Sequence, residues 1–315
     1  MNTSLDVAHK FISALDKNDA DLLSKLIEPS GTWWVDSGHD RAAGVHGNDP
    51  GDDRGWPLHA TMNIGKKVEL LRGIRNRFPT GIRQIRWNSF CYEQYVLVEV
   101  DGYGINTLER VYQNRYAFVI EVTENRVKHV REYLDTHHSA YTFTGKGLDR
   151  RSRIDDFVKC EPEMIGDKIE LGVQFCSVLS NGDSAQLCKI SHDDAIWWAD
   201  SGKDRERGDR SAAIERDPTK FLVGNSLVHD RAMVIPNLRS TFSGGWTLDP
   251  SRIFSDGSSI CVEASSNGCR IKRDGSTMNY QNRYCFILTT SEEKISGVRE
   301  YCDTLHAFDV FGIAP

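Results

Sequence analysis

The sequence predicts an α+β protein made of two copies of one domain, each with helices first and antiparallel strands after them. Its 315 residues suffice for two domains at about 150 residues each. Three motifs occur twice, in the same order, along the chain. Within each copy, apolar residues at helical spacing come first, and β-rich segments separated by turn residues follow. Helices grouped ahead of antiparallel strands are typical of the α+β class.

The internal repeat is the most specific of these observations. The paired motifs are TWWVDSGHDR at 32–41 with IWWADSGKDR at 196–205, YQNRYAF at 112–118 with YQNRYCF at 280–286, and VREYLDTHH at 130–138 with VREYCDTLH at 298–306. The offset is 164 residues for the first pair and 168 for the others, so the second copy gains four residues, which we place after Glu263. Solenoid units have roughly 20–50 residues, so each copy here is a complete domain.

Each copy opens with an amphipathic helix, marked by apolar residues at helical spacing. These residues are Val7, Phe11 and Leu15 in the first copy and Leu171, Phe175 and Leu179 in the second. A short second helix, the WWVD or WWAD strand, a third helix around 68–78 and a turn at 78–81 come next. The rest of the first copy is β-rich and reads as strands: IRWNSFCYE, YVLVEVDG, YQNRYAFVIEV and RVKHVREYLDT.

The repeat also sets the domain boundaries. It places the first domain at 1–144 and the second at 168–315. The stretch between them, 145–167, is rich in charge and turn formers and matches neither copy. We therefore expect a charged linker there.

Composition excludes several classes of partner. The chain has 39 Lys and Arg against 45 Asp and Glu, a net charge of −6 without a basic stripe, so we expect no nucleic acid partner. It has no apolar run of about 18 residues and its N-terminus lacks the features of a signal peptide, so we expect a cytoplasmic protein without a membrane partner. The eight cysteines show neither C-x-x-C nor zinc-ligand spacing and are expected to be reduced apolar fillers.

The repeated motifs carry a resemblance to a known superfamily. Two helices, a W-W-x-D strand, an F-P-x-G turn, Y-x-N-x-Y and a final V-R-E-Y-x-D-T resemble the SnoaL-like branch of the NTF2-like superfamily. That superfamily includes ketosteroid isomerase, limonene epoxide hydrolase and the SnoaL polyketide cyclases. The resemblance implies cone-shaped domains in which a curved antiparallel sheet wraps around N-terminal helices and a deep pocket. It also implies an intrachain pseudo-dimer of the two copies, with a homo-oligomer as a further possibility.

The resemblance assigns a first pair of candidate acids to the tryptophan-rich strands. Ketosteroid isomerase carries its general base at the end of the corresponding strand, where this chain has Asp36 and Asp200. Neighbouring tryptophans, Trp34 and Trp198 among them, would desolvate the carboxyl and raise its pKa toward that of a general base. The tryptophans are also candidate substrate contacts. The alternative is that Asp36 caps the following turn.

A second pair of candidate acids lies on the last strand. Limonene epoxide hydrolase places the first acid of a related strand in its pocket, which by resemblance corresponds to Glu132 and Glu300. Strand alternation puts Tyr112, Asn114 and Tyr116 on one face of the neighbouring strand. The tyrosines can donate hydrogen bonds to an oxyanion or simply pack across strands, and we favour a pocket or network role for Asn114. The equivalent residues of the second copy are Tyr280, Asn282 and Tyr284.

Histidines supply further candidates in the first copy. His46 and His59 are candidate acid/base partners because they titrate near neutral pH, with a surface-loop role as the alternative. Trp56 and His138 are candidate pocket residues, although the histidine can equally satisfy the end of its strand. The spacing of the histidines fits no metal-ligand motif, so we expect no metal.

The sequence favours an enzyme that needs no cofactor. It has no G-x-G-x-x-G, P-loop, G-x-S-x-G or H-E-x-x-H motif. Carboxylates with Tyr and Asn donors suit acid/base chemistry on a hydrophobic, aromatic or polycyclic small molecule, as in an isomerase, cyclase, dehydratase or lyase. One alternative, implied only by the resemblance, is a lyase that releases formaldehyde from lignin-derived diaryl compounds. The other is a non-catalytic module that binds a ligand or a protein.

Overall fold

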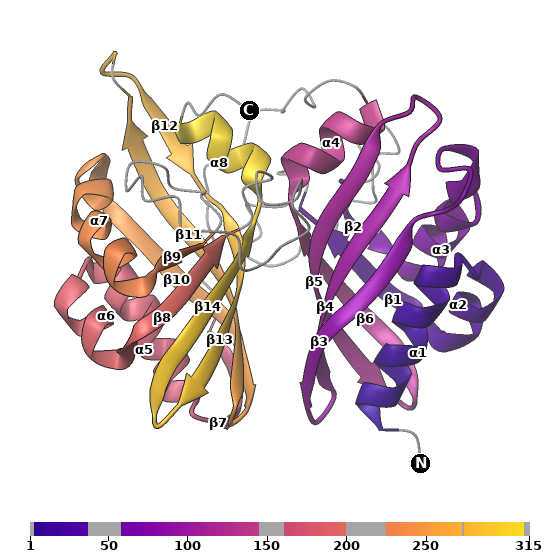
Figure 1. Cartoon of the computed structure of the whole chain (residues 1–315), viewed down its shortest axis with the longest axis horizontal. Coiled ribbons are helices and arrows are strands. Elements are labelled where there is room, and N and C mark those ends of the chain that lie inside the picture. Colours follow the sequence, from indigo (N-terminus) through magenta and orange to yellow (C-terminus); the bar gives the residue numbers. More distant parts are fainter. Residues whose placement is uncertain (1–2, 37–57, 145–160, 200–224, 273, 312–315) are drawn as a thin grey trace. The chain divides into compact units, whose positions relative to one another are not determined.

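The computed structural model confirms the predicted fold class. It divides the chain into two compact units, Met1–Ile154 and Asp155–Pro315, each with helices and one sheet (Figure 1). The structure describes residues 3–36, 58–144, 161–199, 225–272 and 274–311. None of the helices in these ranges is long and apolar enough to span a membrane. The seven cysteines in the same ranges are free thiols.

The first unit is a six-stranded sheet with helices packed on it. Its elements are α1 (Ser4–Lys17), α2 (Ala20–Leu26), β1 (Ile27–Val35), β2 (Ala60–Asn63), α3 (Ile64–Arg72), a 3-10 turn (Ile74–Asn76), β3 (Arg83–Tyr92), β4 (Tyr95–Ile105), β5 (Val111–Thr123), β6 (Arg126–Leu134) and α4 (Thr136–Thr144). The strand order is β2-β1-β6-β5-β4-β3. All neighbours are antiparallel except β1 and β6, which run parallel. The motif-bearing strands of the repeat, β1, β6 and β5, therefore lie side by side.

The second unit repeats this arrangement with additions. Its elements are β7 (Glu163–Asp167), α5 (Ile169–Asn181), α6 (Ser184–Ile190), β8 (Ser191–Ala199), β9 (Asn225–Leu227), α7 (Val228–Ser240), β10 (Phe242–Asp256), β11 (Ser259–Ile271), β12 (Thr277–Tyr280), β13 (Arg283–Ser291), β14 (Lys294–Cys302) and α8 (Thr304–Phe311). The strand order is β7-β10-β11-β13-β14-β8-β9, and β12 pairs with β11. Strands β8 and β14 run parallel, as β1 and β6 do.

Local sequence explains where the first helix of each unit begins and ends. At the start of α1, Thr3 accepts a hydrogen bond from the Asp6 amide and Asp6 accepts one from the Thr3 amide, which is a capping box. Helix α1 ends at Asn18 and α5 at Gly182, both in the left-handed conformation. Glycine and asparagine adopt that conformation at low cost, so these residues end the two helices.

The predicted linker is wrong over its last five residues. Strand β7, residues 163–167, pairs in parallel with β10, so this stretch belongs to the second sheet. Its composition is that of a turn-rich segment, but Met164 and Ile165 supply enough apolar character for an edge strand. Residues 145–160 of the predicted linker lie outside the described part of the chain.

The four extra residues of the second copy lengthen a hairpin. Strands β11 and β12 pair from Gly268↔Tyr280 to Ile271↔Thr277, beyond the point where β11 leaves β13 (Figure 1). The insertion after Glu263 is therefore confirmed in place. It extends a hairpin and leaves the order of the other strands unchanged.

Candidate active site

Glu132 is a buried carboxylate held by a tryptophan from the neighbouring strand. The parallel register pairs Val35 with Glu132, which puts Trp33 and Glu132 on the same face of the sheet. The Trp33 indole Nε1 donates a hydrogen bond to Glu132 Oε2 over 2.6 Å. Burial raises the pKa of Glu132, while the positive charge of Lys67 and the Trp33 hydrogen bond act in the opposite direction. The outcome is a carboxyl group that binds a proton more readily than an exposed glutamate does.

Lys67 of α3 and His59 extend this cluster. The Lys67 ammonium lies 3.8 Å from Glu132 Oε2, 2.8 Å from His59 Nε2 and 5.2 Å from the centre of the Trp33 ring. Burial, and then the charge of Lys67, hold the pKa of His59 well below its usual value, so this ring is neutral. Its Nδ1 lies 2.7 Å from the carbonyl of Ala60, which can only accept. We therefore assign the proton to Nδ1, which leaves Nε2 to accept from Lys67.

A pair of tyrosines shares the face of Glu132. The hydroxyl oxygens of Tyr112 and Tyr116 lie 2.6 Å apart on β5. The register pairs Phe118 with Glu132, so both tyrosines lie on the face that carries the carboxylate. Burial raises the pKa of Tyr112 to about 12, and burial together with Tyr112 and Glu132 raises that of Tyr116 well above its usual value. Both hydroxyls keep their protons at neutral pH, so they serve as hydrogen-bond donors rather than bases.

Asn114 holds the tyrosine pair against the end of β6. Its Nδ2 donates to the Asp135 carbonyl over 3.1 Å and to the Tyr112 hydroxyl over 3.3 Å. Its Oδ1 accepts from the Asp135 amide over 3.2 Å. These contacts are a network role, one of the two roles that the sequence favours for this residue.

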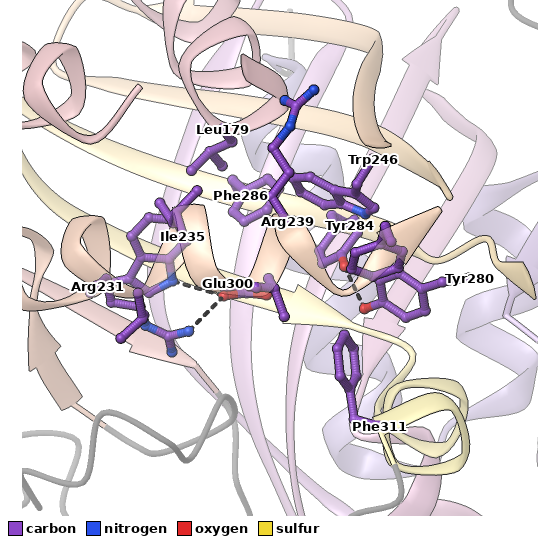
Figure 2. A pocket seen from close by; sticks show the side chains of 14 residues that line it. Leu179, Arg231, Ile235, Arg239, Trp246, Tyr280, Tyr284, Phe286, Glu300 and Phe311 are labelled. Carbon is purple, nitrogen blue, oxygen red and sulfur yellow. Dashed lines mark hydrogen bonds and ion pairs between the residues drawn. The ribbon is translucent and has the colours of Figure 1, made fainter. Parts of the chain in front are cut away.

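The second unit repeats the carboxylate cluster with a different cation (Figure 2). Trp197 Nε1 donates to Glu300 Oε2 over 2.8 Å, and Arg231 Nη1 lies 3.9 Å from the same oxygen. The hydroxyls of Tyr280 and Tyr284 are again 2.6 Å apart. Burial raises the pKa of Glu300, opposed by Arg231 and by the Trp197 hydrogen bond. The repeat thus preserves the geometry while Arg231 takes the place of Lys67.

Asn282 completes the correspondence between the units. Its Nδ2 donates to the Tyr280 hydroxyl over 3.1 Å and to the Asp303 carbonyl over 3.0 Å. The Asp303 amide in turn donates to Asn282 Oδ1 over 3.1 Å. The tyrosine pair of each unit is therefore fixed in the same way.

A pocket in the second unit joins these groups. Figure 2 shows Glu300 between Arg231 on one side and the tyrosine pair, Tyr280 and Tyr284, on the other. The rest of the lining is aliphatic or aromatic apart from Arg239: Leu179, Trp197, Val234, Ile235, Leu238, Phe242, Trp246, Phe286 and Phe311. The cavity volume is about 50 Å³, which is room for a few water molecules. A larger ligand therefore has to displace some of these side chains.

The structure places the other tryptophan of each strand, Trp33 or Trp197, beside the glutamate. Trp34 packs on Tyr133 with ring centres 5.2 Å apart, on the face opposite Glu132. Trp198 packs on Tyr301 at the same distance, and Trp197 rather than Trp198 lines the pocket. Since successive strand residues point to opposite faces, only one tryptophan of each pair can reach the carboxylate.

The histidine after the last strand has a structural contact in both units. His138 Nε2 accepts a hydrogen bond from the Gln113 amide over 3.0 Å, and its ring stacks on Tyr112 with centres 5.5 Å apart. His306 accepts from the Gln281 amide over 3.1 Å. These contacts favour the alternative in which the histidine accepts a backbone hydrogen bond at the end of a strand.

The remaining candidates from the sequence are Asp36, Asp200, His46 and Trp56. Asp36 directly follows β1 and is 4% exposed, so it is desolvated as predicted, and its role as a base stays a prediction. His46, Trp56 and Asp200 lie outside the described residues. Within the described ranges, no group of three or more His, Cys, Asp or Glu side chains is placed to hold a metal ion.

Lys67 and Arg231 are the functional candidates that the sequence reasoning missed. They are related by the same 164-residue offset as the tryptophan motifs. Lys67 adjoins Val68 and follows Ile64, both of which are fully buried in α3. A basic residue on the apolar face of a helix in both copies is a signal that could have identified this pair, because an ammonium or guanidinium group is buried only with a partner.

Solved structures of low sequence identity resemble about half of this chain each. No family model and no curated protein matches the chain. An NTF2-like protein of unknown function from Burkholderia pseudomallei is 12% identical over 46% of this chain and 99% of its own, with a TM-score of 0.36. IdmH, a candidate polyketide cyclase from Streptomyces antibioticus, is 12% identical over 47% and 100%, with a TM-score of 0.35. A candidate SnoaL-like polyketide cyclase from Jannaschia sp. CCS1 is 10% identical over 45% and 92%, with a TM-score of 0.34.

Proposed function

We propose that this protein is an acid/base enzyme, independent of any organic cofactor, that acts on a hydrophobic aromatic or polycyclic small molecule. The observation that carries the proposal is the pocket of the second unit. There, a buried carboxyl group, Glu300, and a hydrogen-bonded tyrosine pair face one largely apolar cavity. Apolar pockets with a few convergent polar groups are typical of small-molecule sites.

The geometry supports proton abstraction next to a carbonyl group. Glu300, as a carboxylate, takes a proton from a carbon atom: the C–H bond breaks and an O–H bond forms on the carboxyl. The electron pair moves to the carbonyl oxygen, where a hydroxyl of the Tyr280 and Tyr284 pair donates a hydrogen bond to the oxyanion. The proton then returns to the same or another atom of the product. Glu132, with Tyr112 and Tyr116, has the same groups in the first unit.

The raised pKa of the glutamates suits this role. A base works best when its pKa lies close to the working pH, and burial moves both carboxyl groups in that direction. The indole donors, Trp33 and Trp197, fix one oxygen of each carboxylate. Both recorded contacts of Glu300 in the described part of the chain end on Oε2, which leaves Oε1 to meet a substrate.

Deuterium exchange tests the proposal without knowledge of the product. Aromatic and polycyclic ketones are incubated with the protein in D₂O, and exchange at the carbon next to the carbonyl is followed by NMR. We expect catalysed exchange for at least one compound, and loss of that exchange in the double variant E132Q/E300Q. A ligand that binds to the wild type, seen as a thermal shift, but exchanges no faster with the protein than without it would leave only a binding module.

A further inference from the structure

The cation beside the buried glutamate is the main chemical difference between the two candidate sites. Lys67 lies 3.8 Å from Glu132, and Arg231 lies 3.9 Å from Glu300. Both cations lie over the tryptophan that holds the carboxylate, at 5.2 Å from its ring centre in each unit. The geometry is therefore the same, and the chemistry of the cation is not.

The surroundings of Lys67 allow it to lose its proton. The Lys67 side chain is 4% exposed, and its ammonium lies 3.8 Å from Glu132 and 2.8 Å from the neutral His59 ring. Burial lowers the pKa of Lys67, with Glu132 opposing. Two other basic residues of α3 have different surroundings. Lys66 is exposed and its charge also lowers the pKa of His59, and Arg72 at the far end pairs with Asp21 of α2 at 2.8 Å.

Arg231 differs from Lys67 both in the groups that it contacts and in its pKa. Its guanidinium faces Glu300, Tyr284 and Cys302, and its Nε donates to Ser226 over 3.3 Å. Burial lowers its pKa as well, but from a value two units higher than that of lysine. A guanidinium therefore stays charged at any pH at which the protein is folded.

Resting on the proposed function, we propose that Lys67 and Arg231 are positioning residues that make the two units work over different pH ranges. Before the proton moves, the negative charge of the buried site lies on the glutamate beside the cation, and afterwards it lies on the substrate oxygen at the tyrosine pair; in both states the cation compensates the net charge of the site. Lys67 stops compensating when it deprotonates at alkaline pH, whereas Arg231 does not. Turnover by the first unit therefore falls at alkaline pH, and turnover by the second continues.

The carboxyl groups can report this difference without any substrate. With the glutamate Cδ atoms labelled with ¹³C, the signals of Glu132 and Glu300 are assigned by their loss in E132Q and E300Q. We expect the Glu132 signal to shift twice with pH, once for its own proton and once at alkaline pH for Lys67. The Glu300 signal shifts once. K67R removes the alkaline shift of Glu132, and R231K adds one to Glu300.

Two further variants make this test decisive. K67M removes the cation and should raise the apparent pKa of Glu132 by about 1 to 3 units. The exposed neighbour variant K66R keeps the charge and should leave both titrations unchanged. An alkaline shift of Glu132 that persists in K67R, or a Glu132 pKa that K67M does not raise, would overturn the inference.

The exchange assay then separates this inference from the proposed function. E300Q disables the second unit, so the remaining exchange reports the first unit and should fall at alkaline pH. E132Q disables the first unit, so the remaining exchange reports the second unit, and its rate should not fall at alkaline pH. If no compound exchanges with the wild type, the proposed function fails while the NMR titration still decides the role of Lys67. If the exchange rate fell equally at alkaline pH in E300Q and in E132Q, the proposed difference in pH range between the two units would be wrong.

Discussion

The two units keep the same carboxylate, indole and tyrosine pair but surround them differently. In the first unit Lys67, which also contacts the neutral His59 ring, lies beside Glu132, and in the second unit Arg231 lies beside Glu300. His59 aligns with Val223 of the second copy, so the titratable neighbour has no counterpart there. The comparison indicates that the proposed base and oxyanion donors are preserved in both copies, while the charged groups around them differ.

The largest effect that tests this comparison comes from the glutamates. E132Q and E300Q each remove one base and keep the shape of the side chain. We expect each to lower exchange by its own unit about 10²- to 10⁴-fold, the usual contribution of a general base. Exchange rates measured for the single and double variants show how the activity divides between the units. Full activity in the double variant would remove both glutamates from the mechanism.

The next effect concerns the asparagines that clamp the tyrosine pairs. N114A leaves the Asp135 amide and carbonyl without this partner, and an unsatisfied buried group costs about 1–3 kcal/mol. N282A makes the same change in the second unit. Urea denaturation followed by circular dichroism measures both. N181A, at an exposed asparagine of α5, serves as the control. If N114A and N282A lost no more unfolding free energy than N181A does, the proposed role of Asn114 and Asn282 in holding the tyrosine pairs would be wrong.

A smaller effect separates the two tryptophans of β1. W33F removes the donor to Glu132 and should raise the pKa of that carboxyl by about one unit, equivalent to about 1.4 kcal/mol. W34F removes a ring of the same size on the opposite face. Both variants lose packing, so the ¹³C titration of Glu132 distinguishes them better than stability does. A similar shift in W34F would mean that packing, and not the hydrogen bond, sets the pKa.

The smallest effect lies in how the first helix of each unit joins the sheet. Asp16 accepts from the Gln84 amide over 2.8 Å and from Arg83 over 2.7 Å, whereas Ser180 bonds to the Leu248 backbone. Burial raises the pKa of Asp16, but these hydrogen bonds outweigh it and the pKa is lowered.

This difference makes the first unit sensitive to acid at Asp16. A lowered pKa means that the stabilisation is present above the ordinary pKa of 3.8 and is lost as the pH falls through the folded value. The D16S variant, which copies Ser180, should remove this dependence and change stability by no more than about 1 kcal/mol. Melting temperatures between pH 2 and 6 measure it. An undiminished acid dependence in D16S would assign the effect to other carboxyl groups.

Much of the fold was predictable because the repeat makes each element appear twice. The buried spacing of Val7, Phe11 and Leu15, the Asn18 stop and the hairpin insertion all follow from local patterns. Strand β7 was not predictable, because an edge strand of five residues in a charged segment carries little periodicity.

The site was predictable only in part. Strand alternation correctly grouped Tyr112 with Tyr116 and left the orientation of the Glu132 face to the resemblance. It could not decide between Trp33 and Trp34, because that choice depends on the parallel register of β1 and β6. The contact between Lys67 and Glu132 joins a helix to a distant strand, and no spacing within either element reveals it.

The tryptophan–glutamate hydrogen bond has a consequence for how the protein is made. It joins residues 99 positions apart in the first unit and 103 apart in the second. Contacts between such distant residues form only after the intervening chain has been ordered. During synthesis, domains generally fold as units from the N-terminus. The first site can therefore assemble while the second half of the chain is still emerging, and a chain that stops before Glu132 lacks the proposed base of the first unit.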